Sequence, residues 1–363
     1  MKQIIFRADS NHSIGMGHVM RCLSIADAAM SVGCEVQFII SDDTVSDLIQ
    51  ERGYKAIVLN SDYKSMELEL KLWPKDLRVD YLIVDSYYVT KHYLLELKHR
   101  VNATGGKLVY IDDVLSFPYP VDILIDYGVY SDEIAYHTLY KGEREEPRFI
   151  LGVLYTPLRA MFRRIAPRIQ PVDVKNVLVS TGGSDELHLS LAIVYELIGT
   201  EPSIRFDRFY HILLGTMNPD KEEIKKIASE TDNIFLYENV TDMKSLIESC
   251  DLAVSAAGST LYEIAVCGVP LITYSIADNQ IPGAESFERL GLAVNVGDLR
   301  DLSSADPNLV MSGSLDTAAV HRIIEAVENL SFDYDRRMAM GARLQEMIDG
   351  FGADRMVQEI LSE

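Results

Sequence analysis

Apolar runs and helix-like segments alternate through the first half of the chain. Residues 3–8 form an apolar run that ends in a polar loop, and residues 18–32 then place apolar side chains at helical spacing. Because strands separated by helices pair in parallel, this alternation predicts a doubly wound α/β sheet. Further strands are expected at 35–40, 81–84, 107–111 and 121–125, with helices near 44–51 and 90–100.

The same plan recurs after a proline-punctuated stretch at residues 167–171. We predict a linker there, separating an N-terminal Rossmann-like domain (1–168) from a C-terminal one (172–363). The second series has strands expected at 174–180, 211–214, 234–237, 252–256 and 271–274, with a helix at 186–198. Two such domains are expected to face each other across a cleft at the carboxyl ends of their strands, where open α/β sheets bind ligands.

The C-terminal tail has no functional interpretation from its pattern. Residues 335–361 are amphipathic and predict one long helix or two. The extension from Ser303 to Glu363 is assigned to the second domain, and packing of a tail helix on the first domain is the alternative.

Composition narrows the class of protein. With 363 residues, 48% of them hydrophobic and 25% charged, the chain is typical of a soluble globular protein of about two domains. We expect a cytoplasmic protein without a membrane partner. No apolar run reaches the ~20 residues that span a bilayer, and the apolar run at the N-terminus is too short for a signal peptide. The four cysteines are far apart in the sequence, as is usual for free cysteines in a reducing compartment. The net charge of −21 argues against nucleic acid. One anionic metabolite remains compatible, because helix N-termini can hold phosphates.

A glycine-rich loop, Ile14-Gly15-Met16-Gly17-His18, follows the first strand and opens a helix. Gly15 and Gly17 permit a tight turn and close approach to a ligand, and the helix start offers N–H groups to a diphosphate. The helix dipole disfavours protonation of His18, so that a neutral imidazole can take a proton from water. A glycine turn with a histidine that only packs or caps explains the same residues.

Two loops of the second half have phosphate-binding character. Gly182 and Gly183 lie in Thr-Gly-Gly-Ser-Asp between a strand and a helix, where a plain turn is the alternative. Gly258, Ser259 and Thr260 open the helix after the strand at 252–256 and place N–H groups and hydroxyls where a phosphate would sit. Glu263, about one turn further on, can accept hydrogen bonds from ribose hydroxyls, or is a solvated acid near the helix N-terminus.

Other polar residues are less specific. Asn279 and Gln280 follow the strand at 271–274, and their amides suit sugar hydroxyls if the loop faces the ligand. Asp85 or Tyr87, just past the strand at 81–84, is a candidate to orient His18 across the cleft, and a strand-end cap explains both equally well. The histidines and acidic pairs form no recognisable ligand set, so neither a metal nor a cofactor is predicted.

The segment from Arg7 to Ala26, with its Gly-Met-Gly-His core, resembles the N-terminal signature of a specific family. These are the UDP-2,4-diacetamido-2,4,6-trideoxy-β-L-altropyranose hydrolases of pseudaminic acid biosynthesis, and related spore-coat polysaccharide proteins share the signature. Residues 151–159 resemble a second family block. The blocks at 181–185, 255–263 and 278–280 are similar to the UDP-binding half of the N-acetylglucosaminyltransferase that completes lipid II.

This resemblance implies a two-Rossmann GT-B fold. His18 matches the general base of the family, Glu263 the residue that binds ribose, and Asn279 a position near the sugar, while the Val240 backbone lies where the uracil edge is read. The implied reaction is hydrolysis of a UDP-linked diacetamido-trideoxyhexose by water attack at the anomeric carbon with inversion. A glycosyltransferase using a UDP-N-acetylhexosamine donor, and a UDP-sugar-binding protein without turnover, are the alternatives.

Overall fold

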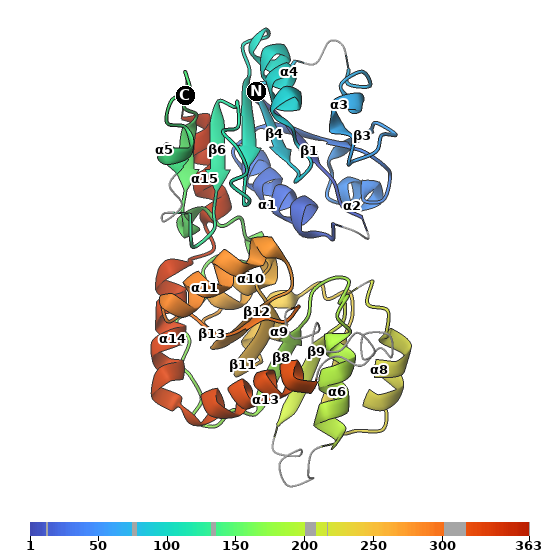
Figure 1. Cartoon of the computed structure of the whole chain (residues 1–363), viewed down its shortest axis with the longest axis vertical. Helices are drawn as coiled ribbons and strands as arrows, with labels where there is room; N and C mark the ends of the chain where they lie inside the picture. Colours follow the sequence, from blue (N-terminus) through green and yellow to red (C-terminus); the bar gives the residue numbers. More distant parts are fainter. Residues whose placement is uncertain are drawn as a thin grey trace. The chain divides into compact units, whose positions relative to one another are not determined.

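Two parallel sheets, each with helices on both faces, form the framework of the chain in the computed structural model (Figure 1). The structure describes residues 1–11, 14–74, 78–131, 136–199, 208–215, 217–300 and 317–362. One unit comprises Met1–Ala160 together with Gly350–Glu363, and the other comprises Met161–Asp349. The doubly wound α/β architecture predicted for both halves is confirmed.

The described residues of the first unit form a seven-stranded sheet in the order β3-β2-β1-β4-β5-β6-β7. The order reverses between β1 and β4, which pair in parallel with Ala8 opposite Asp85. Loops that leave the carboxyl ends of these two strands therefore diverge and leave room for a ligand. The strands are β1 (Gln3–Ala8), β2 (Glu35–Ile40), β3 (Lys55–Val58), β4 (Tyr81–Asp85), β5 (Lys107–Ile111), β6 (Ile123–Asp126) and β7 (Arg148–Leu151).

Alternate residues of these strands face two separate hydrophobic clusters. Ile4 and Phe6 of β1 belong to a cluster that includes residues of α1 and α15, whereas Ile5 belongs to the cluster that includes residues of α3 and α4. This is the pattern of a sheet buried on both faces. The helices of this unit are α1 (Gly17–Ser31), α2 (Ser46–Glu51), α3 (Met66–Glu69), α4 (Lys91–Asn102), α5 (Tyr136–Leu139) and α15 (Gly352–Leu361), with a 3-10 turn, η1, at Val153–Tyr155. Another 3-10 turn, η2 (Ala160–Phe162), spans the point in the chain where the first unit ends and the second begins.

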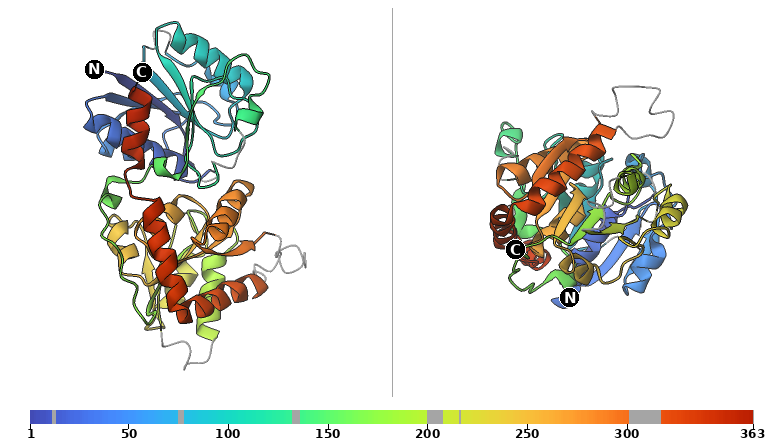
Figure 2. Two further views of the ribbon diagram at one scale, coloured as in Figure 1. Left: turned by 90° about the vertical axis from the view of Figure 1, so that its left-hand side faces the viewer. Right: turned by 90° about the horizontal axis from the view of Figure 1, so that it is seen from below.

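The last helix belongs to the first unit, not to the second as the 172–363 boundary predicted. Met356, Val357 and Ile360 of α15 are buried in the same cluster as the apolar face of α1. The apolar stripe of α15, drawn in red in Figure 2, therefore completes the core of the first sheet. The predicted tail helix is two helices, α14 (Tyr334–Met347) and α15, and the alternative that a tail helix packs on the first domain is confirmed.

The second unit has the same plan with six strands among its described residues, in the order β10-β9-β8-β11-β12-β13. Its order reverses between β8 and β11, which pair in parallel. The strands are β8 (Asn176–Ser180), β9 (Phe209–Leu213), β10 (Ile234–Tyr237), β11 (Leu252–Ala256), β12 (Leu271–Ser275) and β13 (Val294–Asp298). The helices are α6 (Leu189–Gly199), α8 (Lys221–Ala228), α9 (Met243–Glu248), α10 (Ser259–Val266), α11 (Ile281–Arg289), α13 (Thr317–Phe332) and α14 (Tyr334–Met347), with a 3-10 turn, η3, at Asp278–Gln280.

The extension from Ser303 to Glu363 contains α13, α14 and α15, and residues 303–316 lie outside the described residues. None of the helices in the described part of the chain combines the length and the apolar character that crossing a membrane requires.

Candidate functional site

Gly15 organises the described part of the loop between β1 and α1. The Gly15 amide donates to the Asn11 carbonyl at 2.9 Å, and Gly15 has a φ of +68°, which glycine adopts without steric cost. Ser10 Oγ donates to the Gly15 carbonyl at 2.7 Å and holds the turn from the other side. The turn delivers Gly17 as the first residue of α1 and His18 as the second, at the point where the strand order reverses.

His18 is buried and its ring is oriented by a carboxylate. Nδ1 of His18 lies 2.5 Å from Oδ1 of Asp85, the last residue of β4. Nη2 of Arg21 also lies 2.9 Å from Nδ1, but the shorter contact of Nδ1 is to the carboxylate, which only accepts hydrogen bonds, so we assign the proton to Nδ1 and the lone pair to Nε2. Of the two predicted orienting residues, Asp85 thus makes the hydrogen bond. It does so from the neighbouring strand of the same unit, so the expectation of an orienting residue across a cleft is wrong.

Arg21 keeps Asp85 in its charged form. Arg21 lies one turn after His18 on α1, and it donates through Nε to Asp85 Oδ2 at 2.5 Å and through Nη2 to Asp85 Oδ1. Burial by itself would raise the pKa of Asp85, but the Arg21 charge and the hydrogen bonds from Arg21 and His18 outweigh burial and hold that pKa well below its usual range. Asp85 therefore remains the acceptor for the His18 N–H.

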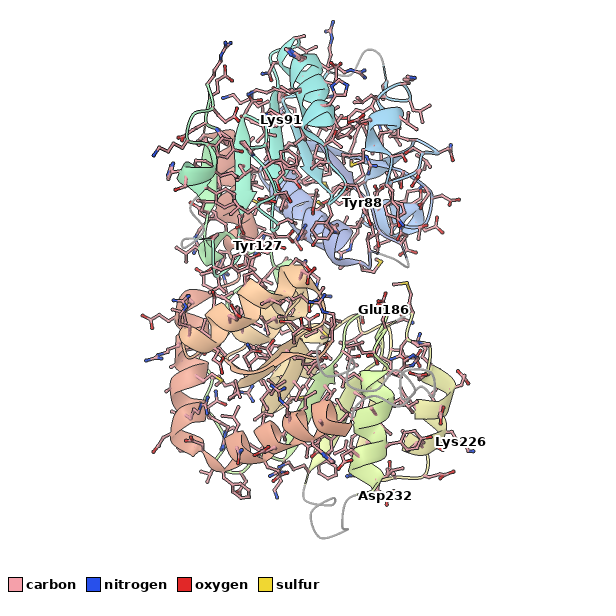
Figure 3. The ribbon with its side chains drawn as sticks, in the orientation of Figure 1. Tyr88, Lys91, Tyr127, Glu186, Lys226 and Asp232 are labelled. Atoms are coloured by element: carbon pink, nitrogen blue, oxygen red, sulfur yellow. The ribbon has the colours of Figure 1, made fainter. Side chains whose placement is uncertain are left out.

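Tyr87 contacts His18 through its ring. The two ring centroids are 4.4 Å apart at 76°, an edge-to-face pair. The Tyr87 hydroxyl donates to Asp113 at 3.0 Å. A small hollow beside this pair is lined by Asp9, Ile14, His18, Asp85, Ser86, Tyr87 and Tyr88. Figure 3 labels Tyr88, which follows β4, and Tyr127, which follows β6.

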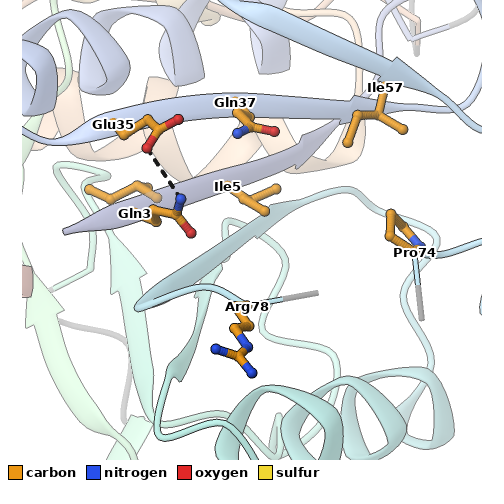
Figure 4. A pocket seen from close by; sticks show the side chains of 8 residues that line it. Gln3, Ile5, Glu35, Gln37, Ile57, Pro74 and Arg78 are labelled. Atoms are coloured by element: carbon orange, nitrogen blue, oxygen red, sulfur yellow. Dashed lines mark hydrogen bonds between the residues drawn. The ribbon is translucent and has the colours of Figure 1, made fainter. Parts of the chain in front are cut away.

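A second and larger hollow of the first unit lies at the opposite edge of its sheet. It measures about 200 Å³ and is shown in Figure 4. Its floor includes Gln3 and Glu35, the first residues of β1 and β2, which hydrogen-bond at 3.2 Å. Open α/β sheets bind ligands at the carboxyl ends of their strands, so His18 and not this hollow marks the candidate site.

In the second unit the Gly182-Gly183 loop leaves the carboxyl end of β8. Gly182 has a φ of +95°, and a Cβ on Gly215 would stand 2.2 Å from the Gly183 carbonyl oxygen, so Gly215 is needed for close packing against the loop. Asp185 caps α6, because its carboxylate accepts the amides of Leu189 and Ser190, each at 2.9 Å. These contacts hold the loop in one conformation.

The neighbouring strand β11 leads into α10. Gly258 is the N-cap in an extended conformation without a side-chain cap, and a Cβ there would meet nothing within 4 Å. Ser259 is exposed, and Thr260 and Glu263 are half-buried in the first turns of α10. The start of this eight-residue helix lies beside the Gly182-Gly183 loop in strand order, because β8 pairs with β11.

The remaining predicted residues lie at the same edge of the second sheet. Asn279 and Gln280 form η3 directly after β12, and both are half-buried. Oε1 of Gln280 accepts the Ile276 amide at 2.9 Å, which fixes the loop. Val240 is half-buried after β10, the edge strand. The predicted residues of each unit thus gather at the carboxyl edge of its own sheet.

Three polar residues of the first site were not predicted. Arg21 shares the α1 face of His18 by its i,i+3 spacing, which is the one sequence signal that pointed to it. Asp113 and Tyr127 follow β5 and β6, and only the sheet order brings them to Arg21. Among the described residues no three His, Cys, Asp or Glu side chains are grouped as a metal ion would require.

Comparison with known proteins agrees with this architecture. Residues 177–301 match the glycosyltransferase family 28 C-terminal domain. In structure the chain is similar to the calicheamicin glycosyltransferase CalG4 (TM-score 0.64, 15% identity, 100% of this chain and 99% of that one). It is also similar to MurG of Acinetobacter baumannii (TM-score 0.62, 14% identity, 100% of both chains). These likenesses establish the fold, two Rossmann-like domains of the GT-B type.

Sequence relatives are more specific. The chain is 25% identical over 265 residues to the Campylobacter jejuni UDP-2,4-diacetamido-2,4,6-trideoxy-β-L-altropyranose hydrolase, covering 72% of this chain and 87% of the relative. It is 28% identical over 283 residues to a Helicobacter pylori protein named pseudaminic acid cytidylyltransferase and UDP-2,4-diacetamido-2,4,6-trideoxy-β-L-altropyranose hydrolase, and the match covers 77% of this chain and 45% of that protein. The Bacillus subtilis spore coat polysaccharide biosynthesis protein SpsG is 24% identical over 291 residues, and the match covers 80% of this chain and 82% of SpsG.

The chain spans about half the length of two of its relatives, the Helicobacter protein and an uncharacterized Methanocaldococcus jannaschii protein that is 25% identical over 284 residues (74% of this chain, 55% of that protein). The sequence resemblance inferred from the Gly-Met-Gly-His signature is therefore confirmed by relatives that match along most of this chain.

Proposed function

We propose that this chain, whose relatives include UDP-2,4-diacetamido-2,4,6-trideoxy-β-L-altropyranose hydrolases, is an enzyme that hydrolyses a UDP-linked 2,4-diacetamido-2,4,6-trideoxyhexose to the free sugar and UDP. The names of the Campylobacter and Helicobacter relatives support the substrate class. We place the reaction in the cytoplasmic synthesis of pseudaminic acid or a related nonulosonic acid, with the UDP-sugar as the one partner.

The observation that carries the proposal is the His18–Asp85 pair. Its Nδ1–H is held by a buried carboxylate, so Nε2 is left as the basic atom, as a general base for water requires. In the proposed reaction Nε2 of His18 takes a proton from water as the water oxygen bonds to the anomeric carbon and the bond from that carbon to the diphosphate oxygen breaks. The products are UDP and the sugar with inverted configuration.

We assign UDP to the second unit. Backbone N–H groups at Gly258 and Ser259, with those of the Gly182-Gly183 loop, would hold the diphosphate and stabilise its charge as it leaves. Thr260 would assist through its hydroxyl, Glu263 would accept the ribose hydroxyls, and the Val240 backbone would read the uracil edge. Asn279 and Gln280 would contact the sugar. Because N–H groups carry the charge stabilisation, turnover is expected to persist when EDTA removes free divalent metal ions.

Hydrolysis in ¹⁸O-labelled water tests the reaction. The label is expected in the free sugar, and label in UDP would contradict attack at the anomeric carbon. NMR of the first turnover product should show the anomer inverted relative to the UDP-sugar. A transferase would release little free sugar without an acceptor, and a binding protein would release none, so either result would overturn the proposal.

His18→Asn is the matched test of the base. We expect turnover to fall on the order of 10²–10⁴-fold, the usual contribution of a general base, while UDP binding measured by calorimetry persists. His92→Asn, an exposed histidine on α4, is the control. Wild-type turnover by His18→Asn would remove His18 from the role of base.

A further inference from the structure

Arg21 has several polar partners at the carboxyl edge of the first sheet. Its side chain is 8% exposed, and its guanidinium contacts two carboxylates, a phenol and the His18 imidazole, with Nη2 2.9 Å from Nδ1. Nε and Nη2 donate to the two oxygens of Asp85, and Nη1 donates to Asp113 at 3.2 Å and to the Tyr127 hydroxyl at 2.8 Å. Buried arginines with this many partners hold their partners in fixed planes.

The two carboxylates lead to the two rings that meet in the site. Asp85 accepts Nδ1–H of His18, and Asp113 accepts the hydroxyl of Tyr87. His18 and Tyr87 are themselves in edge-to-face contact at 4.4 Å. The contacts thus form a closed ring in which one guanidinium ties the imidazole and the phenol to each other through two separate acids.

We propose that Arg21 is a positioning residue that sets the orientation of both the His18 imidazole and the Tyr87 ring. This inference deepens the proposed function, since the aligned imidazole is the base of that reaction. Asp85 alone fixes one end of the imidazole. The bidentate pair with Arg21 fixes the plane of the Asp85 carboxylate, and the Asp113 branch keeps Tyr87 against the ring although Tyr87 is 40% exposed.

Charge also favours arginine here. Asp85 and Asp113 carry two negative charges beside one cation, and the strong pairing with Asp85 raises the pKa of Arg21 well above its usual value although burial lowers it. Arg21 therefore stays charged while His18 gains and returns a proton. A lysine supplies the charge as a single point and cannot span both Asp85 oxygens and Asp113 at once.

The test compares Arg21→Lys and Arg21→Ala with Arg52→Lys, which replaces a partly exposed arginine at the end of α2 in the same unit. With ¹⁵N-histidine-labelled protein, the Nδ1–H of His18 should give a low-field proton signal, assigned by its loss in His18→Asn. We expect Arg21→Lys to broaden or shift that signal and to lower kcat on the order of 10²-fold with KM little changed, as misplacement of a reacting group does. Arg52→Lys should leave the low-field signal and kcat unchanged.

Two further measurements separate positioning from folding. Guanidinium ion added to Arg21→Ala should restore part of kcat, which it would not do for an unfolded protein. Asp113→Ala removes the acceptor that Tyr87 and Arg21 Nη1 share and leaves the contact between Asp85 and His18 in place. It should keep the low-field signal and still lower kcat about tenfold, since Tyr87 is released. Wild-type kcat and an unchanged signal in Arg21→Lys, or wild-type kcat in Asp113→Ala, would overturn the inference.

The NMR readout needs no substrate. If the wild-type protein fails to hydrolyse the UDP-sugar, the proposed function falls, whereas the response of the His18 signal to Arg21→Lys still decides whether Arg21 positions the imidazole.

Discussion

Asp112 and Asp126 share one tyrosine hydroxyl: Oη of Tyr136 lies 2.8 Å from Oδ2 of Asp112 and 3.0 Å from Oδ2 of Asp126. A hydroxyl has one proton to donate, so a second proton on one of the acids is needed to satisfy both contacts. Burial raises the pKa of both acids, that of Asp126 to about 8, against the opposing hydrogen bond from the Gly128 amide. Asp126 is therefore the acid that keeps its proton near neutral pH.

The first prediction is that the first unit becomes less stable as pH rises, because folded Asp126 then loses this proton. Between the unfolded pKa of about 3.9 and the folded pKa of about 8, folded Asp126 binds more proton than the unfolded chain does. The free energy of unfolding should then fall by up to about 1.4 kcal/mol per pH unit in that window. Asp126→Asn can donate its amide to Tyr136 at any pH, so its stability should change less with pH.

Thermal unfolding between pH 5 and pH 8 measures this effect. Asp232→Asn, an exposed position of the second unit labelled in Figure 3, is the control and should keep the wild-type slope. An unchanged slope in Asp126→Asn would show that Asp126 is ionised in the folded protein.

The second prediction concerns the tautomer of His18. Asp85→Asn should lower turnover on the order of 10²–10⁴-fold, because an asparagine amide can donate to Nδ1 and so move the ring proton to Nε2. Steady-state kinetics and UDP binding are the measurements, and affinity for UDP should be unchanged. Turnover close to wild type would mean that Nε2 does not act as the base.

Much of the fold was predictable because the inner strands are mostly apolar. Strands β1, β2, β5 and β11, and also the edge strand β10, begin and end where the apolar pattern predicted. Three strands were missed, β3, β7 and β13, and each lies at an edge of its sheet. Edge strands are half-exposed, so polar residues such as Lys55, Arg148 and Asn295 break their apolar pattern.

The site was predictable only in part. Glycines before a helix pointed to His18, and a residue just past a strand pointed to Asp85, because each is a local signal. Their meeting depends on β1 and β4 being neighbours, which the chain order does not reveal. Asp113 and Tyr127 follow β5 and β6 and reach Arg21 only through the order of the strands, so no single segment predicts them. The assignment of α15 failed for the same reason, since an apolar stripe does not say which sheet it covers.

The third prediction concerns ribose recognition by Glu263. Glu263→Ala should weaken UDP binding roughly 10–100-fold, as loss of hydrogen bonds to a carboxylate does. Affinity for 2′,3′-dideoxy-UDP should be the same in both proteins, because that ligand lacks the hydroxyls. Calorimetry measures the affinity of the wild type and of Glu263→Ala for each of the two ligands. Glu222→Ala, at an exposed position on α8, is the control. Equal losses for both ligands would place Glu263 away from the ribose.

The last prediction tests the assignment of α15 to the first unit. Ile360 is fully buried among residues of the first core, so Ile360→Ala should destabilise that unit by about 2–5 kcal/mol. Gln358→Ala, an exposed position on the same helix, is the matched control and should stay within ~0.5 kcal/mol of the wild type.

Limited proteolysis with mass spectrometry distinguishes the two units. In Ile360→Ala, cleavage sites within Met1–Ala160 should become accessible at a lower temperature than in the wild type, while sites within Met161–Asp349 should keep their protection. The reason is that α15 packs on α1 and that its buried side chains belong to the core of the first unit. Earlier cleavage within the second unit instead would mean that α15 stabilises that unit, as the 172–363 boundary assumed.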